Sequence, residues 1–389
     1  MTWQMLPLKN FGRIITGKTP PTARTELFGE AYPFITPTDI DGSQRKVTTS
    51  RFLSSEGERF QHTLLLPPKS VCVVCIGATI GKICFTDKPS FTNQQINSIV
   101  VNETEHDALF VYYALKLKSP DLIKLAGGAA TPILNKSSFS EVKIGAPPLE
   151  TQQKIAAILS AYDDLIENNT RRIQILDEMV RLIYEEWFVR FRFPGYESVE
   201  LVESELGVVP EGWEIKKLGL LIRRLTAGNT YRDSDIGSEG DVIVVDQSTS
   251  EYLGFHNNQP DLHADPEHPI VIFGDHTCKL QIMTTSFSIG ANTVPFVTND
   301  DTPGYYLYNL IKGLVTTQEY KRHWTELNNK MVIKASSKLC VQYDEIVKPF
   351  FVAMDVYRSK NRKLRRMRDL LLPNLMSGEI DVSNFPEPE

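Results

Sequence analysis

Several features are scarce or missing in this sequence of 389 residues, and each absence excludes a class of protein. No run of 18 or more apolar residues occurs, so we expect no membrane-spanning helix. The N-terminus MTWQMLPLKNFGRIITGKTP lacks the basic and then apolar pattern of a signal peptide. The five cysteines are an odd number in a long chain, which favours a reducing cytoplasm over a disulfide scaffold.

Catalytic motifs are also missing. The segment GATIGK, from Gly77 to Lys82, imitates a phosphate-binding loop, but it has three residues between its glycines where that motif has four, and no Ser or Thr follows Lys82. The Pro-Pro pairs read TPPT, LPPK and APPL, unlike the Asp/Asn/Ser-Pro-Pro-aromatic tetrapeptide of a DNA amino-methyltransferase. No G-x-G-x-x-G follows a predicted strand, so the dinucleotide-binding motif is absent. The motif of a nuclease metal site is too loose to be excluded from one sequence. We predict a chain without catalysis or a metal of its own.

Cys72 and Cys75 form a C-x-x-C in SVCVVCIGATIG. This spacing suits a metal or redox site, but no second C-x-x-C or close His pair completes a zinc site. The run is apolar and rich in β-branched residues, so we interpret it as a buried strand.

A long helix is predicted in the middle of the chain. Pro147 and Pro148 prevent a helix before them, and Thr151 is a plausible N-cap. Apolar residues then recur at a spacing of four and three, which is typical of a coiled-coil helix that ends near Pro194 and Gly195. The predicted helix-pair core comprises Leu159, Ile166, Asn169, Ile173, Leu176 and Val180, where the polar Asn169 would fix the register.

The C-terminus shows a second helix of the same kind. Pro373 and Gly378 are expected to end it, and seven bases lie between Arg358 and Arg368. The first helix is rich in acids, so opposite charges favour pairing of the two helices. The predicted core positions of the second helix are Tyr357, Lys360, Leu364, Met367 and Leu371.

The sequence contains an internal repeat. The segment WQMLPLKNFGRIITGKTP resembles WEIKKLGLLIRRLTAGNTY at an offset of 210, and the two helices match at an offset of 191. Further matches in the same order join SVCVVCIGATIG to PIVIFGDHTCKL, FTNQQINSIVV to SIGANTVPFVT, and LFVYYALK to YYLYNLIK. The chain is therefore predicted to be two copies of one unit, each an α/β part followed by a long helix. The predicted order is a first α/β part (1–150), a long helix (151–192), a Pro-, Gly- and Glu-rich linker (193–210), a second α/β part (211–345) and a second long helix with a C-terminal tail (346–389).

These segments occur in the order found in a known family. PPLETQQKIAAILSAYDDLIENN, EEWF, VPEGW and LLLPNLMSGEIDV closely resemble the specificity subunit of type I restriction–modification systems over essentially the whole chain. The second half departs from that pattern, because VQYDEIVKPFF replaces a clear PPL-x-x-Q before its helix.

The resemblance implies an α+β fold in which two pseudo-twofold-related α/β target-recognition domains are separated by two long helices that form an antiparallel coiled coil. Each domain would read one half of a split sequence in double-stranded DNA, in the cytoplasm, as part of bacterial defence. The helices would act as a spacer and dock two methylation (modification) subunits, which restriction subunits then join. No cofactor is expected on this chain, since S-adenosylmethionine, ATP and Mg²⁺ belong to the partner subunits.

Polar and basic loop residues are the candidates for DNA contacts, because Arg, Lys, Asn, Gln and Thr side chains read base edges. In the first half they are Thr16, Lys18, Thr19, Thr79, Lys82, Asn93, Gln94, Asn135 and Lys136. In the second half they are Thr226, Asn229, Arg232, His276, Thr277, Lys279, Asn329, Lys330 and Lys334. Each of them could equally be an ordinary surface residue.

The charge limits how this chain can bind DNA. Residues 1–150 hold 16 bases and 13 acids (+3), whereas residues 211–345 hold 12 bases and 18 acids (−6), and the whole chain carries −6. An autonomous DNA-binding protein is usually basic, so partners would supply most backbone contacts. Two other interpretations remain open, a non-enzymatic coiled-coil adaptor and the recognition part of another restriction–modification enzyme.

Overall fold

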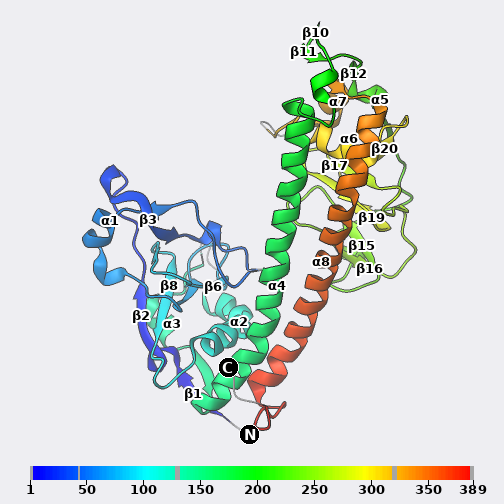
Figure 1. Ribbon diagram of the computed structural model, residues 1–389. Helices are drawn as coiled ribbons and strands as arrows, with labels where there is room; N and C mark the ends of the chain where they lie inside the picture. Colours follow the sequence, from blue (N-terminus) through cyan, green and yellow to red (C-terminus); the bar gives the residue numbers. More distant parts are fainter. Residues whose placement is uncertain (1–2, 43, 128–131, 318–321, 386–389) are drawn as a thin grey trace. The chain divides into compact units, whose positions relative to one another are not determined.

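The computed structural model describes residues 3–42, 44–127, 132–317 and 322–385. The chain divides into two compact units (Figure 1). The first unit comprises residues 1–169 and 360–389, and the second comprises residues 170–359. Each unit contains one α/β part and a segment of both long helices, which confirms the predicted α+β class.

The first unit is built around a four-stranded antiparallel sheet with the strand order β2-β8-β5-β6. A three-stranded sheet, β4-β3-β7, and a two-stranded sheet, β1-β9, complete it. Its strands are β1 (Gln4–Pro7), β2 (Gly12–Thr16), β3 (Phe28–Ile35), β4 (Phe52–Leu53), β5 (Val71–Val74), β6 (Ile83–Phe85), β7 (Phe91–Thr92), β8 (Ile96–Val101) and β9 (Lys143–Ala146). Its short helices are α1 (Ser55–Phe60), α2 (Ala108–Leu125) and α3 (Lys136–Ser140).

Both faces of this sheet are covered. Val71 and Val73 pack into the core shared with α2, while Cys72 and Val74 pack into the core shared with Ile35 of the second sheet. A strand that is buried on both faces needs apolar residues at every position, which explains the uninterrupted apolar run VCVV. The interpretation of the C-x-x-C segment as a buried strand is consistent with this packing.

The second unit repeats the scheme. Its central sheet has the antiparallel order β13-β20-β17-β18, and the sheets β14-β19-β15-β16 and β12-β21 accompany it. Its strands are β12 (Glu214–Lys217), β13 (Ile222–Arg224), β14 (Thr230–Tyr231), β15 (Val242–Val245), β16 (Gly254–His256), β17 (Ile270–Gly274), β18 (Leu280–Met283), β19 (Phe287–Gly290), β20 (Thr293–Thr298) and β21 (Met331–Lys334). Its short helices are α5 (Leu218–Leu221), α6 (Gly304–Ile311) and α7 (Trp324–Asn328).

The repeat is visible in the strand register as well as in the order. Gln4 of β1 pairs with Ala146 of β9, and Glu214 of β12 pairs with Lys334 of β21, both in antiparallel pairs. Trp3 and Trp213 therefore occupy equivalent positions, each one residue before the strand of this pair that comes first in the sequence.

The long helices differ at their ends from the sequence-based prediction. Helix α4 spans Leu149–Tyr184 and continues as a π-helical turn, Glu185–Val189. Helix α8 spans Ser337–Ser377, so it begins well before the predicted residue 346. Thr151 was predicted to cap the start of α4 and Pro373 to end α8, but Thr151 lies inside α4 and Pro373 lies inside α8. Pro373 is exposed, so the backbone hydrogen bond that it removes faces solvent.

The two helices are equivalent at an offset of 188, not the predicted 191. They begin at Leu149 and Ser337, and the helical conformation ends at Val189 and Ser377. The 36 residues of α4 with the five-residue π-helical turn thus match the 41 residues of α8.

The helices run antiparallel within each unit. In the first unit, Asp163 of α4 pairs with Arg368 of α8, and Asn169 donates a hydrogen bond to Asn361 Oδ1 at 2.9 Å. In the second unit, the Tyr343 hydroxyl donates to the backbone oxygen of Val180 at 3.4 Å.

The predicted stripe on α8 was wrong by one residue at two positions. Lys360 is exposed and Met367 is 50% exposed, whereas the neighbouring Asn361 and Arg368 are buried. The stripe contains these two polar residues, so the apolar residues alone suggested a displaced register. Of the other predicted positions, Leu159, Ile166, Asn169 and Val180 lie buried, and Ile173, Leu176, Tyr357, Leu364 and Leu371 lie partly buried.

Two further observations complete the fold. The predicted linker contains a two-stranded hairpin, β10 (Leu201–Ser204) and β11 (Gly207–Pro210). Among the described residues, no helix combines the length and the apolarity that crossing a membrane requires.

Candidate nucleic-acid interface

Three polar loops of the first unit meet at one end of its central sheet. Strand β2 ends at Thr16, β5 ends at Val74, and β8 begins at Ile96. The register pairs Thr16 with Asn97 and Val74 with Ile96, so these ends are neighbours. The loop after β2, the loop after β5 and the loop before β8 therefore lie at one edge of the sheet. The sequence alone does not predict this, because it does not give the order of the strands.

Backbone contacts hold the loop after β2 against the loop before β8. Lys18 donates its backbone N–H to Thr92 O at 2.9 Å, and a Cβ added to Gly17 would lie 2.2 Å from the same oxygen. Only glycine permits this approach. Thr16 Oγ1 donates to Asn97 Oδ1 at 2.6 Å, so Thr16 is a positioning residue, and the side chain of Lys18 remains exposed.

Gln94 and Asn93 have different surroundings although they are adjacent. Gln94 is exposed and accepts hydrogen bonds at Oε1 from Thr19 Oγ1 (2.8 Å) and from the Thr19 N–H (3.3 Å). Asn93 is buried and donates to Gln95 Oε1 at 2.9 Å. Gln94 and Lys18 are thus exposed beside the half-buried Thr19, while Asn93 shapes the loop beneath them.

The loop after β5 adds the third part of this edge. Gly77, with φ of +96°, donates its N–H to Pro132 O at 3.1 Å, and Leu134 donates to Cys75 O at 2.8 Å. Thr79 and Lys82 lie half-buried on this loop. Residues 128–131, which precede the candidates Asn135 and Lys136 in the sequence, lie outside the described part of the chain.

Two candidates of the first unit belong to α3. Asn135 Oδ1 accepts a hydrogen bond from the Ser138 N–H at 2.9 Å and so caps the helix. Lys136 is the first helical residue and is exposed. Since α3 packs against β2 and the turn Leu8–Asn10, Lys136 starts a helix that leads away from the loop edge.

The second unit gathers different residues at the equivalent edge. Strand β13 ends at Arg224, and the register pairs Gly274 at the end of β17 with Thr293 at the start of β20. Asn229 donates its N–H (2.9 Å) and its side-chain amide (3.1 Å) to Asp261 Oδ1. Thr226 and Arg232, in the same loop region, are exposed.

The loop 275–279 fastens a neighbouring loop. Thr277 Oγ1 donates to Gln247 O at 2.6 Å, and the His276 N–H donates to Gln247 Oε1 at 3.1 Å. Lys279 Nζ donates to Asp246 O at 3.0 Å and to Ser250 O at 2.6 Å. Burial lowers the pKa of Lys279. Lys279 is therefore a positioning residue whose ammonium group is occupied within the protein.

Three candidates of the second unit lie elsewhere. The backbone oxygen of Lys330 accepts from Leu218 at the start of α5, and Asn329 is adjacent to it, so both lie near the beginning of β13 and not beyond its end. Lys334 lies in strand β21, where its side chain is 8% exposed and pairs with Asp300 Oδ2 at 2.8 Å. The prediction that Lys334 lies on a loop is wrong, because the residue lies in strand β21 and its ammonium group pairs with a carboxylate in a largely buried site.

Exposed cations that the sequence candidates omitted lie on the strands that lead to the two edges. Arg13 is exposed on β2, and Arg223 and Arg224 are exposed on β13. Both β2 and β13 are edge strands of their sheets. The adjacent pair of arginines at 223 and 224 was the available signal in the sequence.

The described residues contain no group of three or more His, Cys, Asp or Glu side chains that could hold a metal ion. Burial raises the pKa of the Cys75 thiol to about 11. The candidate site thus consists of two polar loop edges, one in each unit, and each edge lies on a sheet of the same topology.

The chain is similar to proteins of known families. Residues 1–178 match the family model described as "Type I restriction modification DNA specificity domain". The type I restriction enzyme MjaIX specificity subunit of Methanocaldococcus jannaschii is 25% identical over 411 residues, which cover 98% of this chain and 94% of that protein. The HindI specificity subunit of Haemophilus influenzae is 38% identical over 184 residues, which cover 45% of this chain and 39% of that protein.

The fold is also found in a solved structure. The S subunit of a type I restriction–modification system from M. genitalium has a TM-score of 0.58 and 17% identity, and the match covers 96% of each chain.

Proposed function

We propose that this chain, whose residues 1–178 belong to the family of type I restriction modification DNA specificity domains, is the DNA-recognition subunit of a type I restriction–modification complex. It reads a bipartite target in double-stranded DNA, one part with each α/β unit. The observation that carries the proposal is the pair of polar loop edges, which share strand order but carry different sets of polar side chains.

The two edges supply the groups that sequence reading requires. Thr19, Gln94 and Lys18 in the first unit, and Thr226 and Arg232 in the second, are hydrogen-bond donors or acceptors on loops held by a rigid sheet. Side chains of these types discriminate base edges in the major groove. The scaffold residues beneath them, such as Asn97 and Asp261, fix the loop shape.

The chain acts with partners. Its net charge of −6 opposes autonomous binding to phosphates, so other subunits supply most contacts to the DNA backbone. Two methylation subunits dock on the long helices, restriction subunits join them, and S-adenosylmethionine, ATP and Mg²⁺ bind to these partners. The chain itself performs no catalysis, and it works in the cytoplasm, where its DNA target lies.

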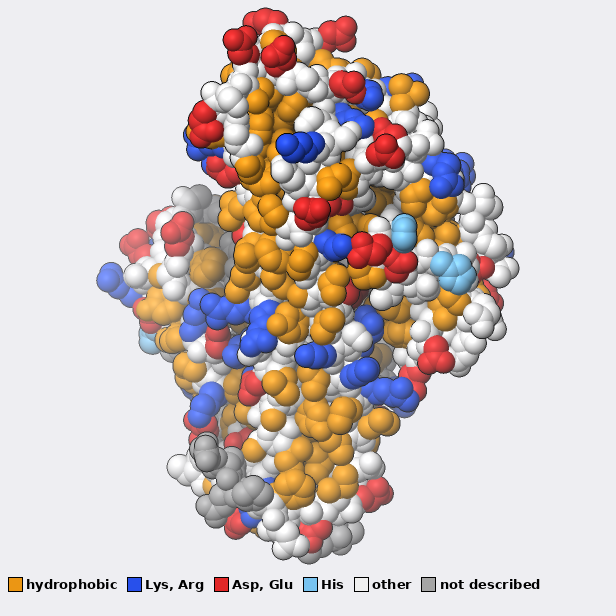
Figure 2. Space-filling model, turned by 45° about the vertical axis from the view of Figure 1, so that its right-hand side comes forward, with side chains coloured by type: hydrophobic (Ala, Val, Ile, Leu, Met, Phe, Trp, Pro, Cys, Tyr) orange, Lys and Arg blue, Asp and Glu red, His pale blue; other side chains and the backbone are white. Residues whose placement is uncertain are grey.

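The helices carry apolar side chains that a partner could cover. In the second unit these include Ile175, Met179 and Leu182 of α4, and in the first unit Leu165 of α4 and Leu370 of α8. Figure 2 shows such side chains gathered along the helices, with Lys and Arg side chains between them. Exposed apolar patches of this kind mark protein interaction sites.

Domain exchange tests the proposal. Residues 1–150 are replaced with the corresponding part of a related specificity subunit, the hybrid is expressed with the methylation subunits, and the methylated sites are mapped. We expect one part of the target to change and the other to stay the same, because each edge is built within its own unit. A hybrid that changes both parts contradicts independent reading.

A gel-shift assay with and without methylation subunits separates the proposal from its alternatives. A coiled-coil adaptor would shift no specific DNA in either case. The proposed subunit shifts its target DNA strongly only when the methylation subunits are present.

A further inference from the structure

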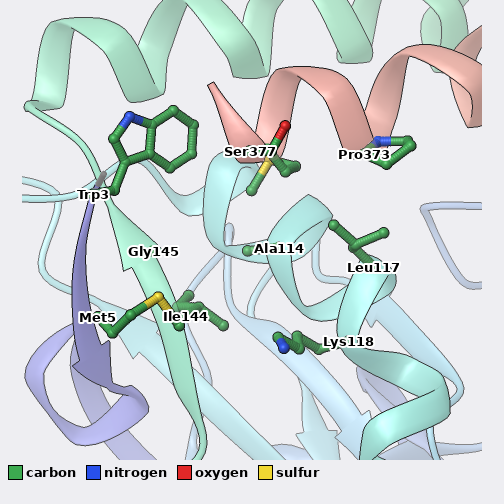
Figure 3. Close-up of a pocket in the computed structure, with 10 residues that line it drawn as sticks. Trp3, Met5, Ala114, Leu117, Lys118, Ile144, Gly145, Pro373 and Ser377 are labelled. Carbon is green, nitrogen blue, oxygen red and sulfur yellow. The ribbon is translucent and has the colours of Figure 1, made fainter. Parts of the chain in front are cut away.

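The first unit has an apolar groove beside the end of α8. Its volume is about 420 Å³, and strands β1 and β9, helix α2 and the last turn of α8 contribute side chains to it (Figure 3). Apolar residues dominate its lining, among them Trp3, Met5, Leu117 and Pro373. Lys118 is the one charged residue among those that line it.

Trp3 forms a flat wall of this groove because glycines adjoin its ring. A Cβ added to Gly145 would lie 3.0 Å from Trp3 Cε3, and one added to Gly378 would lie 3.2 Å from Trp3 Cζ2. Gly378 also has φ of +76°, a conformation that favours glycine at a helix end. The indole thus lies against the backbone of β9 and of the α8 terminus.

The equivalent tryptophan of the second unit, Trp213, is partly buried and packs against aromatic rings of its own chain. The register places Ile333 opposite Ile215, where the first unit has Gly145 opposite Met5. The ring of Trp213 lies 5.9 Å from Phe188, 5.3 Å from Phe191 and 5.6 Å from Phe193, measured between ring centroids. Three phenylalanines therefore surround Trp213.

The backbone at this point is unusual. Phe188 belongs to the π-helical turn that ends α4, and Phe191 has φ of +58°. A bulky residue rarely adopts the left-handed region, and local strain of this kind persists only where the surrounding packing compensates for it. The aromatic packing on Trp213 provides that compensation.

We propose that the groove of the first unit receives a large apolar side chain, flanked by a carboxylate, from a helix of a methylation subunit, and that the closed counterpart in the second unit offers no such site. This inference rests on the proposed function. The chemistry of the occupant follows from the second unit, where aromatic rings fill the equivalent place, and from the positive charge of Lys118 at the groove.

The surface beside the groove supports a helical partner. Met367 and Leu370 of α8 are 50% and 59% exposed, and they precede Pro373 and Ser377 at helical spacing on the same helix. An amphipathic helix lying along α8 would cover these side chains and place an anchor residue in the groove. Among the described residues, Lys118 forms an exposed contact of 3.2 Å with Asp121, which a partner carboxylate can replace.

A matched pair of methionine substitutions tests the proposal. Met5→Glu introduces a charge into the groove at a residue that is 51% exposed. Met331→Glu is the control, because Met331 is 45% exposed in the equivalent two-stranded sheet of the second unit. The full chain is mixed with the purified methylation subunit, and native mass spectrometry and calorimetry measure the stoichiometry and both dissociation constants. Thermal melting of each variant verifies folding.

We expect Met5→Glu to weaken one of the two binding events at least tenfold, while Met331→Glu leaves both unchanged. Lys118→Glu should weaken the same event as Met5→Glu, since it would repel the carboxylate. Unchanged binding by a folded Met5→Glu variant overturns the groove proposal and leaves the proposed function intact. A wild-type chain that binds no methylation subunit overturns the proposed function and, with it, this inference.

Discussion

The two units use one scaffold and fill it differently. Their central sheets share the order of four antiparallel strands, and the two long helices, each of which contributes a segment to both units, have equal lengths. Yet residues 1–150 carry a charge of +3 and residues 211–345 carry −6, and the loop edges hold different side chains. Strand order and helix length are constrained by packing, whereas loops and surface charges tolerate change. The comparison separates residues that build the unit from residues that give it specificity.

The helix interiors make the contrast sharper. Asp163 and Arg368 form a buried ion pair in the first unit, and Tyr113 donates its hydroxyl to Asp163 Oδ2 at 2.6 Å. At the offset of 188, the equivalent positions in the second unit are Phe351 and Val180, which lie in its apolar core. Equivalent buried positions of the two units thus hold an ion pair in one unit and two apolar side chains in the other.

The largest expected effect follows from breaking the ion pair. Arg368→Val leaves Asp163 buried without its counter-charge, which should lower the free energy of unfolding by about 3–5 kcal/mol. Chemical denaturation of the purified chain, followed by circular dichroism, measures this loss. If the transition midpoint stays within error of the wild type, the pair is not a buried one.

The double variant is the control for that experiment. Asp163→Phe with Arg368→Val installs the second unit's residues in the first, and we expect it to recover most of the lost stability. The Tyr113 hydroxyl then lacks an acceptor, so recovery should fall short by about 1–3 kcal/mol.

The next prediction concerns the buried amide pair. Asn361 accepts from Asn169 and donates to Ile166 O at 3.4 Å, whereas the equivalent positions in the second unit are Ile173 and Tyr357. Asn361→Leu leaves the Asn169 amide unpaired, which should cost about 1–3 kcal/mol in the free energy of unfolding.

Replacing both asparagines with leucine distinguishes stability from register. The double variant should be at least as stable as the wild type, because no polar group remains unpaired. We expect its two helices to pair in more than one register, since a buried amide pair specifies helix register. Disulfide trapping between cysteines introduced on exposed faces of the two helices reports the register, and a single trapped register in the double variant contradicts this role.

These interior pairs also mark where the sequence was sufficient and where it was not. Heptad spacing predicted both long helices, because apolar periodicity over many turns is a strong signal. The start of α8 was placed at residue 346 instead of Ser337, whereas Pro349 lies inside the helix on an exposed side. Asn361 and Arg368 escaped attention because a stripe was defined by apolar residues alone.

The candidate interface was predictable only in part. Polar loop composition indicated Thr19, Gln94 and Thr226, which the structure places at loop edges. Lys279 and Lys334 have the same composition signal, but their partners Asp246 and Asp300 lie more than 30 residues away in the chain. Local sequence cannot distinguish an exposed lysine from one that is paired by the tertiary fold.

The N-terminus of helix α2 in the first unit and that of helix α6 in the second unit are capped by different residues. This difference predicts that stability depends on pH. The Phe110 N–H of α2 is bound by Asp107, just before the helix, whereas the Tyr305 and Tyr306 N–H groups of α6 are bound by Asp344 of α8. Burial raises the pKa of Asp344 to about 7, although both N–H groups favour the ionised form.

The sign of the effect follows from this shift. Because the folded state favours the protonated carboxyl, stability is highest at low pH and falls as pH rises from near 4 toward 7. Between pH 5.5 and 8 we expect a loss of about 1–2 kcal/mol from this group, with one proton or less released. Denaturation curves across this range measure the slope, and Asp344→Asn should flatten it. Equal slopes in the two proteins would show that Asp344 titrates normally.

The smallest expected effect contrasts two lysines at opposite places in the two units. Lys18 is exposed at the loop edge of the first unit, and Lys330 lies beside α5 near the start of β13, away from the loop edge of the second unit. If the loop edges face DNA, Lys18→Ala removes one phosphate contact and weakens binding by about 1 kcal/mol. The loss should be similar for specific and unrelated DNA, and the slope of log K against log salt should fall by about one, because one fewer counterion is released. Lys330→Ala should change neither quantity. Binding is measured by salt titration of the complex with methylation subunits. Equal effects of the two substitutions would mean that charge is spread over the unit surfaces. A larger effect of Lys330→Ala would assign the DNA to the opposite ends of the sheets, where the strand pairs and not the loops would have to read it.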